Sequence, residues 1–407
     1  MLAFRREPAH GAPVRRNEQP LTPRTKPRRP ARAEVVGSLL RPPRLQAALD
    51  GFYEGNHAAI LEQEREKDRS RLRALEDEAI SDAVARQIDA GLDIVTDGEF
   101  RRALFMNSFV DAVSGFTANP QLLQFTGDDG SVVETPGVPL VAGRLRKIDS
   151  PAVREIEYLS SLTDHPFKVT IPCASIHQMQ LPLIFKPGLT DRVYADHEEL
   201  VGDILSIERE LVADAVAAGV KYLQFDYPVY PHLVDPRWIE LLKSVGIDAD
   251  VLLEQSIAAD QAIVAGIPED VTLGIHICRG NYKSRWLAQG SLEPLAERIF
   301  NELPYDVFLV EWEDVRRDGD YSAIRFVPPG RIVVMGIVSS KQPALETEDE
   351  LLRRMDEAAG YLPLEQLAIS TQCGFASNRL GNEVDEDTQW RKLELVARVA
   401  DRLWNGG

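Results

Sequence analysis

Two potential metal ligands lie two residues apart in one short apolar segment of the sequence. His276 and Cys278 belong to the mostly apolar run 272–278. If this run is a β-strand, both side chains lie on the same face, because side chains alternate along a strand. An imidazole nitrogen and a thiolate sulfur are both typical zinc ligands. Taken alone, the pair also fits a buried cysteine beside a hydrogen-bonded histidine.

Two further potential ligands end other apolar runs. Glu311 follows four apolar residues, and Cys373 ends the run 367–373. A carboxylate at the end of a buried strand indicates a partner for its charge. If the fold brings these strand ends together, His276, Cys278, Glu311 and Cys373 form a tetrahedral zinc site. The distribution of cysteine agrees, because two of only three cysteines occupy these positions.

A zinc ion with two thiolate ligands favours one kind of chemistry. Such an ion is a weak Lewis acid toward water, but it still lowers the pKa of an incoming thiol. A free thiol is ionised to only a few per cent near pH 7. We therefore expect the metal to hold a substrate sulfur as a thiolate nucleophile, and Glu311 to be the ligand most readily displaced.

Other polar residues at the ends of apolar runs predict a pocket for an amino acid. Gly37 and Ser38 offer backbone N–H groups and a hydroxyl to a carboxylate, whereas Glu99, Gln224 and Asp226 offer oxygens to an ammonium group. Singly, each fits a helix cap, a turn residue or a solvated acid. Together, and beside a thiol-activating metal, they predict binding of an amino acid that carries a thiol.

Two residues at other strand ends have less specific interpretations. Lys341 follows the run 331–338 and is a candidate for binding an anionic group of the substrate. Cys173 ends the run 167–173 and fits a buried strand residue. We therefore expect Cys173 to take no part in metal binding.

The elements that position these residues are eight short apolar runs, separated by longer segments of helical pattern. The runs are 34–40, 93–99, 167–173, 222–228, 272–278, 306–312, 331–338 and 367–373. This alternation predicts parallel strands joined by crossover helices. Eight such units predict an α/β fold of the closed (β/α)₈ TIM barrel type, in which active sites lie at the carboxyl ends of the strands.

Two segments fall outside a minimal barrel. Residues 1–33 are rich in Pro and Arg, with nine Lys or Arg against two Glu, and they have no apolar period. We expect this basic tail to be disordered, because it cannot bury enough apolar surface to offset its conformational entropy. Residues 116–150 predict a hairpin insertion after the second strand. A single catalytic barrel domain over 34–407 is the expected organisation.

The composition excludes several classes of function. The 407 residues are 44% hydrophobic and 27% charged, which suits a large soluble core. A formal net charge of −18 argues against a nucleic-acid partner. No apolar run approaches the ~18 residues that a membrane span requires. Few, scattered cysteines fit a reducing compartment, so the cytoplasm is the expected location.

The sequence resembles the cobalamin-independent methionine synthase family, and is most similar to its short, single-barrel bacterial homologues. The resemblance runs from about residue 34 to the C-terminus. It rests on Val36-Gly37-Ser38 with Arg41-Pro42, Asp97-Gly98-Glu99-Phe100, Gln224-Phe225-Asp226, His276-x-Cys278, Glu311, Ser339-Ser340-Lys341 and Gln372-Cys373-Gly374-Phe375-Ala376.

The resemblance implies an activity and a role for each of these residues. It implies that a methyl group passes from 5-methyltetrahydrofolate to the zinc-bound thiolate of homocysteine, which gives methionine. The zinc ligands would be His276, Cys278, Glu311 and Cys373. The amino-acid end of homocysteine would be held by Gly37, Ser38, Glu99 and Asp226.

The chain departs from the large two-barrel enzyme around the methyl donor and the metal. Arg279-Gly280-Asn281 replaces a more apolar, aromatic stretch, and Tyr227 replaces an acidic residue after Asp226. These changes leave a folate-type or a methyl-corrinoid donor open. Two alternatives also stay open, namely zinc-dependent alkylation of another thiol such as coenzyme M by an epoxide, and a purely structural zinc.

Overall fold

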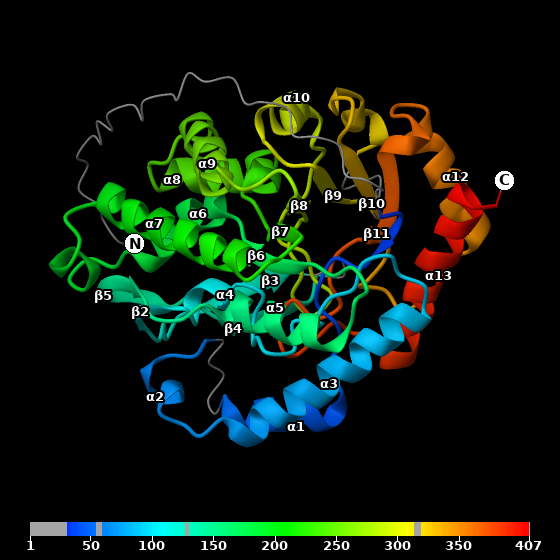
Figure 1. Ribbon diagram of the computed structural model, residues 1–407. Coiled ribbons are helices and arrows are strands. Elements are labelled where there is room, and N and C mark those ends of the chain that lie inside the picture. Colours follow the sequence, from blue (N-terminus) through cyan, green and yellow to red (C-terminus); the bar gives the residue numbers. More distant parts are fainter. Residues whose placement is uncertain (1–30, 54–58, 127–129, 313–318, 407) are drawn as a thin grey trace.

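This computed structural model of the chain describes residues 31–53, 59–126, 130–312 and 319–406. The sheet, its helices and the candidate site lie within these ranges (Figure 1). Residues 1–30 of the predicted tail lie outside the described residues.

Seven parallel strands form one curled sheet in the order β1-β11-β10-β9-β8-β7-β6. The strands are β1 (Ala33–Glu34), β6 (Val169–Pro172), β7 (Tyr222–Asp226), β8 (Thr272–Ile277), β9 (Val307–Glu311), β10 (Ile332–Val338) and β11 (Leu367–Thr371). From β6 to β11, strands that are consecutive in the sequence are neighbours in the sheet, as strand–helix units require. The predicted α/β fold with parallel strands is therefore confirmed.

Both faces of this sheet are covered, which explains why its strands are continuous apolar runs. All residues of β7, β9 and β11 are buried. Along β9, Leu309 packs in a cluster with Tyr222 and Val334 on one face, whereas Phe308 and Val310 pack in the larger cluster that includes the helices. The curled sheet thus has an inner core of its own.

Helices cover the outer face of the sheet (Figure 1). The long ones are α1 (Pro43–Phe52), α3 (Ser70–Asp89), α5 (Pro151–Leu162), α6 (Ala174–Ile184), α7 (His197–Ala217), α8 (Pro236–Ser244), α9 (Ala249–Val264), α10 (Glu293–Glu302), α12 (Glu348–Ala359) and α13 (Glu386–Trp404), with single turns at α2 (Glu62–Arg65) and α4 (Asn107–Val110). Asp196, Thr347 and Asp385 cap α7, α12 and α13 by accepting backbone N–H groups. Among the described helices, none has the length and apolar character needed to span a membrane.

The predicted strand at 93–99 forms only single bridges. Ile94 bridges Glu34 of β1, and Val95 bridges Phe167 just before β6, both in the parallel sense. This short stretch therefore lies between the two edge strands of the seven-stranded sheet.

The chain leaves this strand-like path at Gly98 and Glu99. Their φ angles are 67° and 56°, in the left-handed region that most residues other than glycine avoid. Such a turn ends the ladder, so the predicted run is longer than the paired segment.

The segment between α4 and α5 contains two antiparallel ribbons. β2 (Val113–Thr117) pairs with β5 (Leu140–Lys147), and β3 (Leu122–Thr126) pairs with β4 (Val132–Pro136). Val113, Val141 and Leu145 pack against Ile204 and Leu211 of α7. The β2–β5 ribbon thus lies outside the parallel sheet, on the helical layer.

The crowding around Gly336 gives a test of the packing between β9, β10 and β11. A Cβ atom on Gly336 would lie 2.7 Å from the carbonyl oxygen of Val310 and 3.0 Å from Cα of Gln372. We expect Gly336→Ala to lower the free energy of unfolding by about 1–3 kcal/mol, because overpacked cores must shift backbone. Urea denaturation measures this change.

Gly202 in α7 is the matched control, since a Cβ atom there meets nothing within 4 Å. Gly202→Ala should leave the stability unchanged or raise it by roughly 0.5–1 kcal/mol. Equal stability of Gly336→Ala and the wild type would contradict the described packing.

Candidate metal centre

Three potential metal ligands meet at the carboxyl ends of β8 and β11. His276 lies in β8, Cys278 follows its last residue, and Cys373 lies two residues after β11. One ligand atom from each, namely a ring nitrogen and two sulfurs, lies within 4.8 Å of the others. Since β9 and β10 separate these two strands in the sheet, its curvature brings the side chains together. All three are buried.

The chemistry of this group fits a zinc ion. Among the described residues, neither ring nitrogen of His276 has a nitrogen or oxygen hydrogen-bond partner. Buried polar groups nearly always have a partner, so this imidazole is short of one. One nitrogen and two sulfurs that converge from two strands are three of the four ligands of a tetrahedral zinc site.

The pKa values of the two buried cysteines shift in opposite directions. The hydrogen bond between them raises the pKa of Cys278 well above its ordinary value, and burial adds to this effect. The same hydrogen bond lowers the pKa of Cys373 well below its ordinary value, with a further contribution from His276. Cys373 is therefore the more readily ionised of the pair, and binding of a metal would displace the proton of Cys278.

Glu311, the fourth predicted ligand, lies beside this group but outside the set of three. Its Oε1 accepts hydrogen bonds from Lys341 Nζ at 2.5 Å and Gln372 Nε2 at 3.1 Å, and its Oε2 accepts one from the backbone N–H of Arg279 at 2.8 Å. Burial would raise the pKa of Glu311, but the charge and hydrogen bond of Lys341 lower it. The sequence predicted that Lys341 meets an anion of the substrate, whereas in the structure it meets this carboxylate.

Two predicted substrate-binding acids lie at the same mouth of the sheet. Asp226 ends β7 and is the register partner of His276. Its Oδ1 accepts a hydrogen bond from Gln224 Nε2 at 2.7 Å, and Glu99 Oε1 accepts one from Thr170 Oγ1 at 3.1 Å. Among the described residues, Glu99 Oε2 and Gln224 Oε1 have no partner. These buried acceptors suit a donor-rich cation.

The pKa shifts of Asp226 and Glu99 also favour a bound ammonium group. Burial raises the pKa of Asp226 to about 7, and the charge of Glu99 adds to this effect while His276 opposes it. Burial also raises the pKa of Glu99, against the opposing charge of Arg102. A bound ammonium group would satisfy both carboxylates, since an opposite charge nearby favours their ionised form.

Gly37 and Ser38, also predicted from the sequence, lie against the same acids and the cysteine loop. A Cβ atom on Gly37 would lie 2.5 Å from Glu99 Oε1, so only glycine allows this position of the carboxylate. Ser38 Oγ accepts the backbone N–H of Ala376 at 3.3 Å, and Ser38 O accepts that of Phe375 at 2.8 Å. The segment thereby connects the Glu99 turn to the loop that contains Cys373.

Sequence analysis missed the residues that hold these loops in place. Arg41, which is buried, donates hydrogen bonds to the carbonyl oxygens of Glu99, Arg102 and Ala376 at 2.7–2.9 Å. Arg102 donates to Thr170 Oγ1 at 2.7 Å and thus supports the partner of Glu99. An arginine near Pro42 was visible in the sequence, but nothing there indicated carbonyl groups as its partners.

Comparison with known proteins gives one matching family model and several related sequences. The family model described as "Cobalamin-independent synthase, Catalytic domain" matches residues 54–391. The uncharacterized protein YxjH of Bacillus subtilis (strain 168) is 31% identical over 92% of this chain and 95% of its own length. The 5-methyltetrahydropteroyltriglutamate–homocysteine methyltransferase of Ralstonia pickettii (strain 12J) is 24% identical over 73% of this chain. That match covers 34% of the Ralstonia protein, so the chain corresponds to about a third of it.

A solved structure shares the fold. The crystal structure of a putative vitamin-B12 independent methionine synthase from Listeria monocytogenes superposes with a TM-score of 0.67 at 26% identity. The superposition covers 92% of this chain and 98% of the Listeria chain.

Proposed function

Since the chain belongs to the cobalamin-independent methionine synthase family through its catalytic domain, we propose that it transfers a methyl group to homocysteine in a zinc-dependent reaction that gives methionine. The methyl donor is proposed to be of the 5-methyltetrahydrofolate or methyl-corrinoid type. The observation that carries the proposal is the convergence of His276, Cys278 and Cys373 beside two buried carboxylates.

The ligand set is proposed to be His276, Cys278 and Cys373, with Glu311 as the fourth ligand when the thiol is absent. When bound, zinc would lower the pKa of the homocysteine thiol and so supply a thiolate nucleophile near neutral pH. Glu311 already has alternative partners in Lys341 and Gln372. These partners support the proposal that its place can pass to the substrate sulfur, because the carboxylate would stay hydrogen-bonded.

The amino-acid end of homocysteine is proposed to lie between β7 and the Glu99 turn. Asp226 and Glu99 would bind the ammonium group as ionised carboxylates and are the proposed catalytic residues, because they orient the substrate, with Gln224 as a further acceptor. The backbone at Gly37 and the hydroxyl of Ser38 would face the carboxylate. The position of Asp226 opposite His276 in the sheet register supports this orientation, since it places the ammonium site beside the metal centre.

The proposed site needs the strand ends arranged around one mouth, and we propose that the sheet closes into a (β/α)₈ barrel. The bridges of Ile94 and Val95 support closure, because they connect β1 to Phe167, which lies just before β6. Across the same gap, Lys168 Nζ donates to Glu34 Oε2 at 2.5 Å, and both groups are buried. The proposed barrel domain spans 34–407, with an insertion at about 116–150 and a basic tail at 1–33.

The same acids favour homocysteine over a thiol that carries a sulfonate, such as coenzyme M. A sulfonate needs cationic partners, whereas Glu99 and Asp226 would repel it. The nearest candidate cations are engaged with the protein, because Lys341 pairs with Glu311 and the Arg279 guanidinium donates to the carbonyl oxygen of Gly290. All three cysteines are reduced and buried, which supports a cytoplasmic location.

Identification of the thioether product tests this function. Zinc-loaded protein is incubated with homocysteine and, in separate reactions, methyltetrahydrofolate, methylcobalamin or an epoxide, and the products are determined by mass spectrometry. We expect methionine with one of the two methyl donors. An S-alkyl product from the epoxide alone, or no thioether from any donor, would contradict the proposal.

A further inference from the structure

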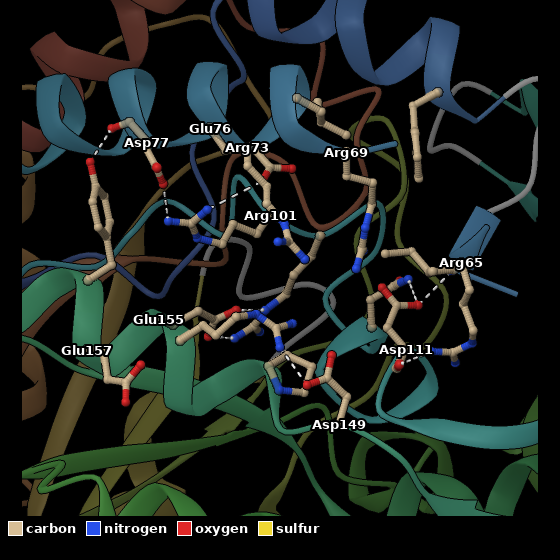
Figure 2. Close-up of a pocket in the computed structure, with 18 of the residues that line it drawn as sticks. Arg65, Arg69, Arg73, Glu76, Asp77, Arg101, Asp111, Asp149, Glu155 and Glu157 are labelled. Atoms are coloured by element: carbon tan, nitrogen blue, oxygen red, sulfur yellow. Dashed lines mark hydrogen bonds and ion pairs between the residues drawn. The ribbon is translucent and has the colours of Figure 1, made fainter. Parts of the chain in front are cut away.

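A cavity lies away from the candidate metal centre, between α3, α5 and the loop after Glu99. Its volume is about 400 Å³, and its walls are strongly charged (Figure 2). Six arginines line it, namely Arg65, Arg69, Arg73, Arg101, Arg102 and Arg154. None of these residues belongs to the proposed metal or homocysteine site.

Most of the acids in the cavity wall already have cationic partners. Arg101 pairs with Glu76 at 3.4 Å and with Asp77 at 2.5 Å. Arg102 binds both carboxylate oxygens of Glu155, at 2.9 and 2.5 Å. These two arginines are therefore neutralised by the wall itself.

The acids on the opposite side are similarly engaged. Asp149 accepts a hydrogen bond from Arg154 at 2.5 Å. Asp111 accepts hydrogen bonds from the backbone N–H of Ile60 and from Asn107 Nδ2, both at 2.7 Å. Burial raises the pKa of Asp111 to about 7, so near neutral pH this carboxyl does not contribute a full negative charge.

Arg69 and Arg73 differ from the other arginines of the cavity in the partners of their guanidinium groups. Among the described residues, no hydrogen bond or ion pair engages either guanidinium, and Figure 2 shows both side chains pointing from the start of α3 into the cavity. Residues four positions apart lie on one face of a helix, where two like charges repel each other. Wall acids such as Glu76, Asp111 and Asp149 interact with the charge of Arg69 only at longer range. Two guanidinium groups side by side, neither of them hydrogen-bonded to or paired with any described acid, can therefore accept an anion.

We propose that this cavity binds a small oxyanion with two or more negative charges, of the phosphate or polycarboxylate class, through Arg69 and Arg73. Guanidinium groups match the planar, bidentate geometry of such oxygens. A monovalent anion would leave one of the two cations unpaired. The cavity volume also suffices for a ligand larger than a single phosphate.

The cavity is separate from the proposed methyl-transfer site, but Arg102 connects the two. Arg102 forms part of the cavity wall, and its other contacts include Thr170 Oγ1, which in turn donates to Glu99. Anion binding in this cavity requires neither metal nor homocysteine. The anion proposal can therefore fail while the proposed methyl transfer holds, and the proposed methyl transfer can fail while the anion proposal holds.

Titration calorimetry of the full chain tests the proposal, with pyrophosphate and citrate as separate ligands at constant ionic strength. We expect saturable binding of at least one of them. Binding of pyrophosphate alone would assign the phosphate class, and binding of citrate alone would assign the polycarboxylate class. Arg69→Gln and Arg73→Gln should each raise the dissociation constant about tenfold or more, because charge-assisted hydrogen bonds are lost.

Arg71→Gln is the matched control, since Arg71 lies on the same helix and is exposed like Arg73, but does not line the cavity. Its dissociation constant should stay within about twofold of the wild type, since only long-range screened charge is lost. Circular dichroism and thermal melting confirm that each variant is folded. The proposal is overturned if the wild type binds neither ligand, or if Arg71→Gln weakens binding as much as the two cavity variants.

Discussion

Replacing Cys373 with serine is expected to release the metal and to reduce methyl transfer below detection. Cys373 has the lower pKa of the buried cysteine pair, whereas a serine hydroxyl at this position stays protonated near neutral pH. Zinc affinity should fall by more than about 100-fold, since even the hydrogen-bond partners of metal ligands contribute 10–100-fold. Metal content per chain after dialysis and turnover with homocysteine measure the two effects.

Cys173→Ser is the control for this variant. Cys173 is also buried, but it lies directly before the first residue of α6 and outside the group of three ligands. It should keep its metal and its turnover, although a buried hydroxyl can lower the stability. If Cys373→Ser keeps both zinc and turnover, the assignment of ligands is wrong.

A second large loss of activity toward homocysteine is expected from Asp226→Asn. Loss of the carboxylate removes the charge that would bind the substrate ammonium in a buried site. We expect kcat/KM for homocysteine to fall by about 30-fold to several thousand-fold, because truncating one partner of a buried charge pair costs about 2–5 kcal/mol. Zinc content should not change, since Asp226 is not a proposed ligand.

A substrate analogue separates recognition of the ammonium group from a general loss of activity. 4-Mercaptobutyrate has the thiol and the carboxylate of homocysteine but no ammonium group. The wild type should discriminate strongly against it, and Asp226→Asn should lose most of this discrimination. Asp260→Asn is a matched control, because Asp260 is a buried aspartate that binds Tyr230 Oη and Ser175 N instead. Equal discrimination by Asp226→Asn and the wild type would refute the proposed role.

The sequence predicted the parallel α/β sheet because its strands are buried on both faces. A strand such as Val307–Glu311 must then be a continuous apolar run, which is visible without any knowledge of its neighbours. The stretch 93–99 was also predicted to be a strand, but it pairs only at Ile94 and Val95. The left-handed turn at Gly98 and Glu99 ends it early, and single residues with positive φ are not readable from apolar pattern.

Part of the candidate site was also predictable from local spacing. His276 and Cys278 share a strand face, and the structure brings Cys373 to them from three strands away in the sheet. The pairing of Glu311 with Lys341 was not predictable, because it depends on which side chains of β9 and the loop after β10 point toward each other. Contacts of this kind join residues that no periodicity relates.

The contacts of Arg41 could not be predicted from the sequence either. Its hydrogen bond to Ala376 O joins residues 335 positions apart. An arginine bound to carbonyl oxygens leaves no charge pattern in the sequence, since its partners are backbone groups present at every residue. Composition and spacing therefore identified the chemical groups of the site, but not the residues that hold their loops.

The central claim is that the metal centre binds the substrate sulfur. X-ray absorption at the zinc edge, recorded on zinc-loaded protein with and without homocysteine, tests it most directly. The account predicts two sulfur ligands at ~2.3 Å in the free protein and three with homocysteine, with loss of one oxygen ligand. An unchanged sulfur count at saturating homocysteine would mean that the thiol does not reach the metal, and the proposed reaction would be wrong.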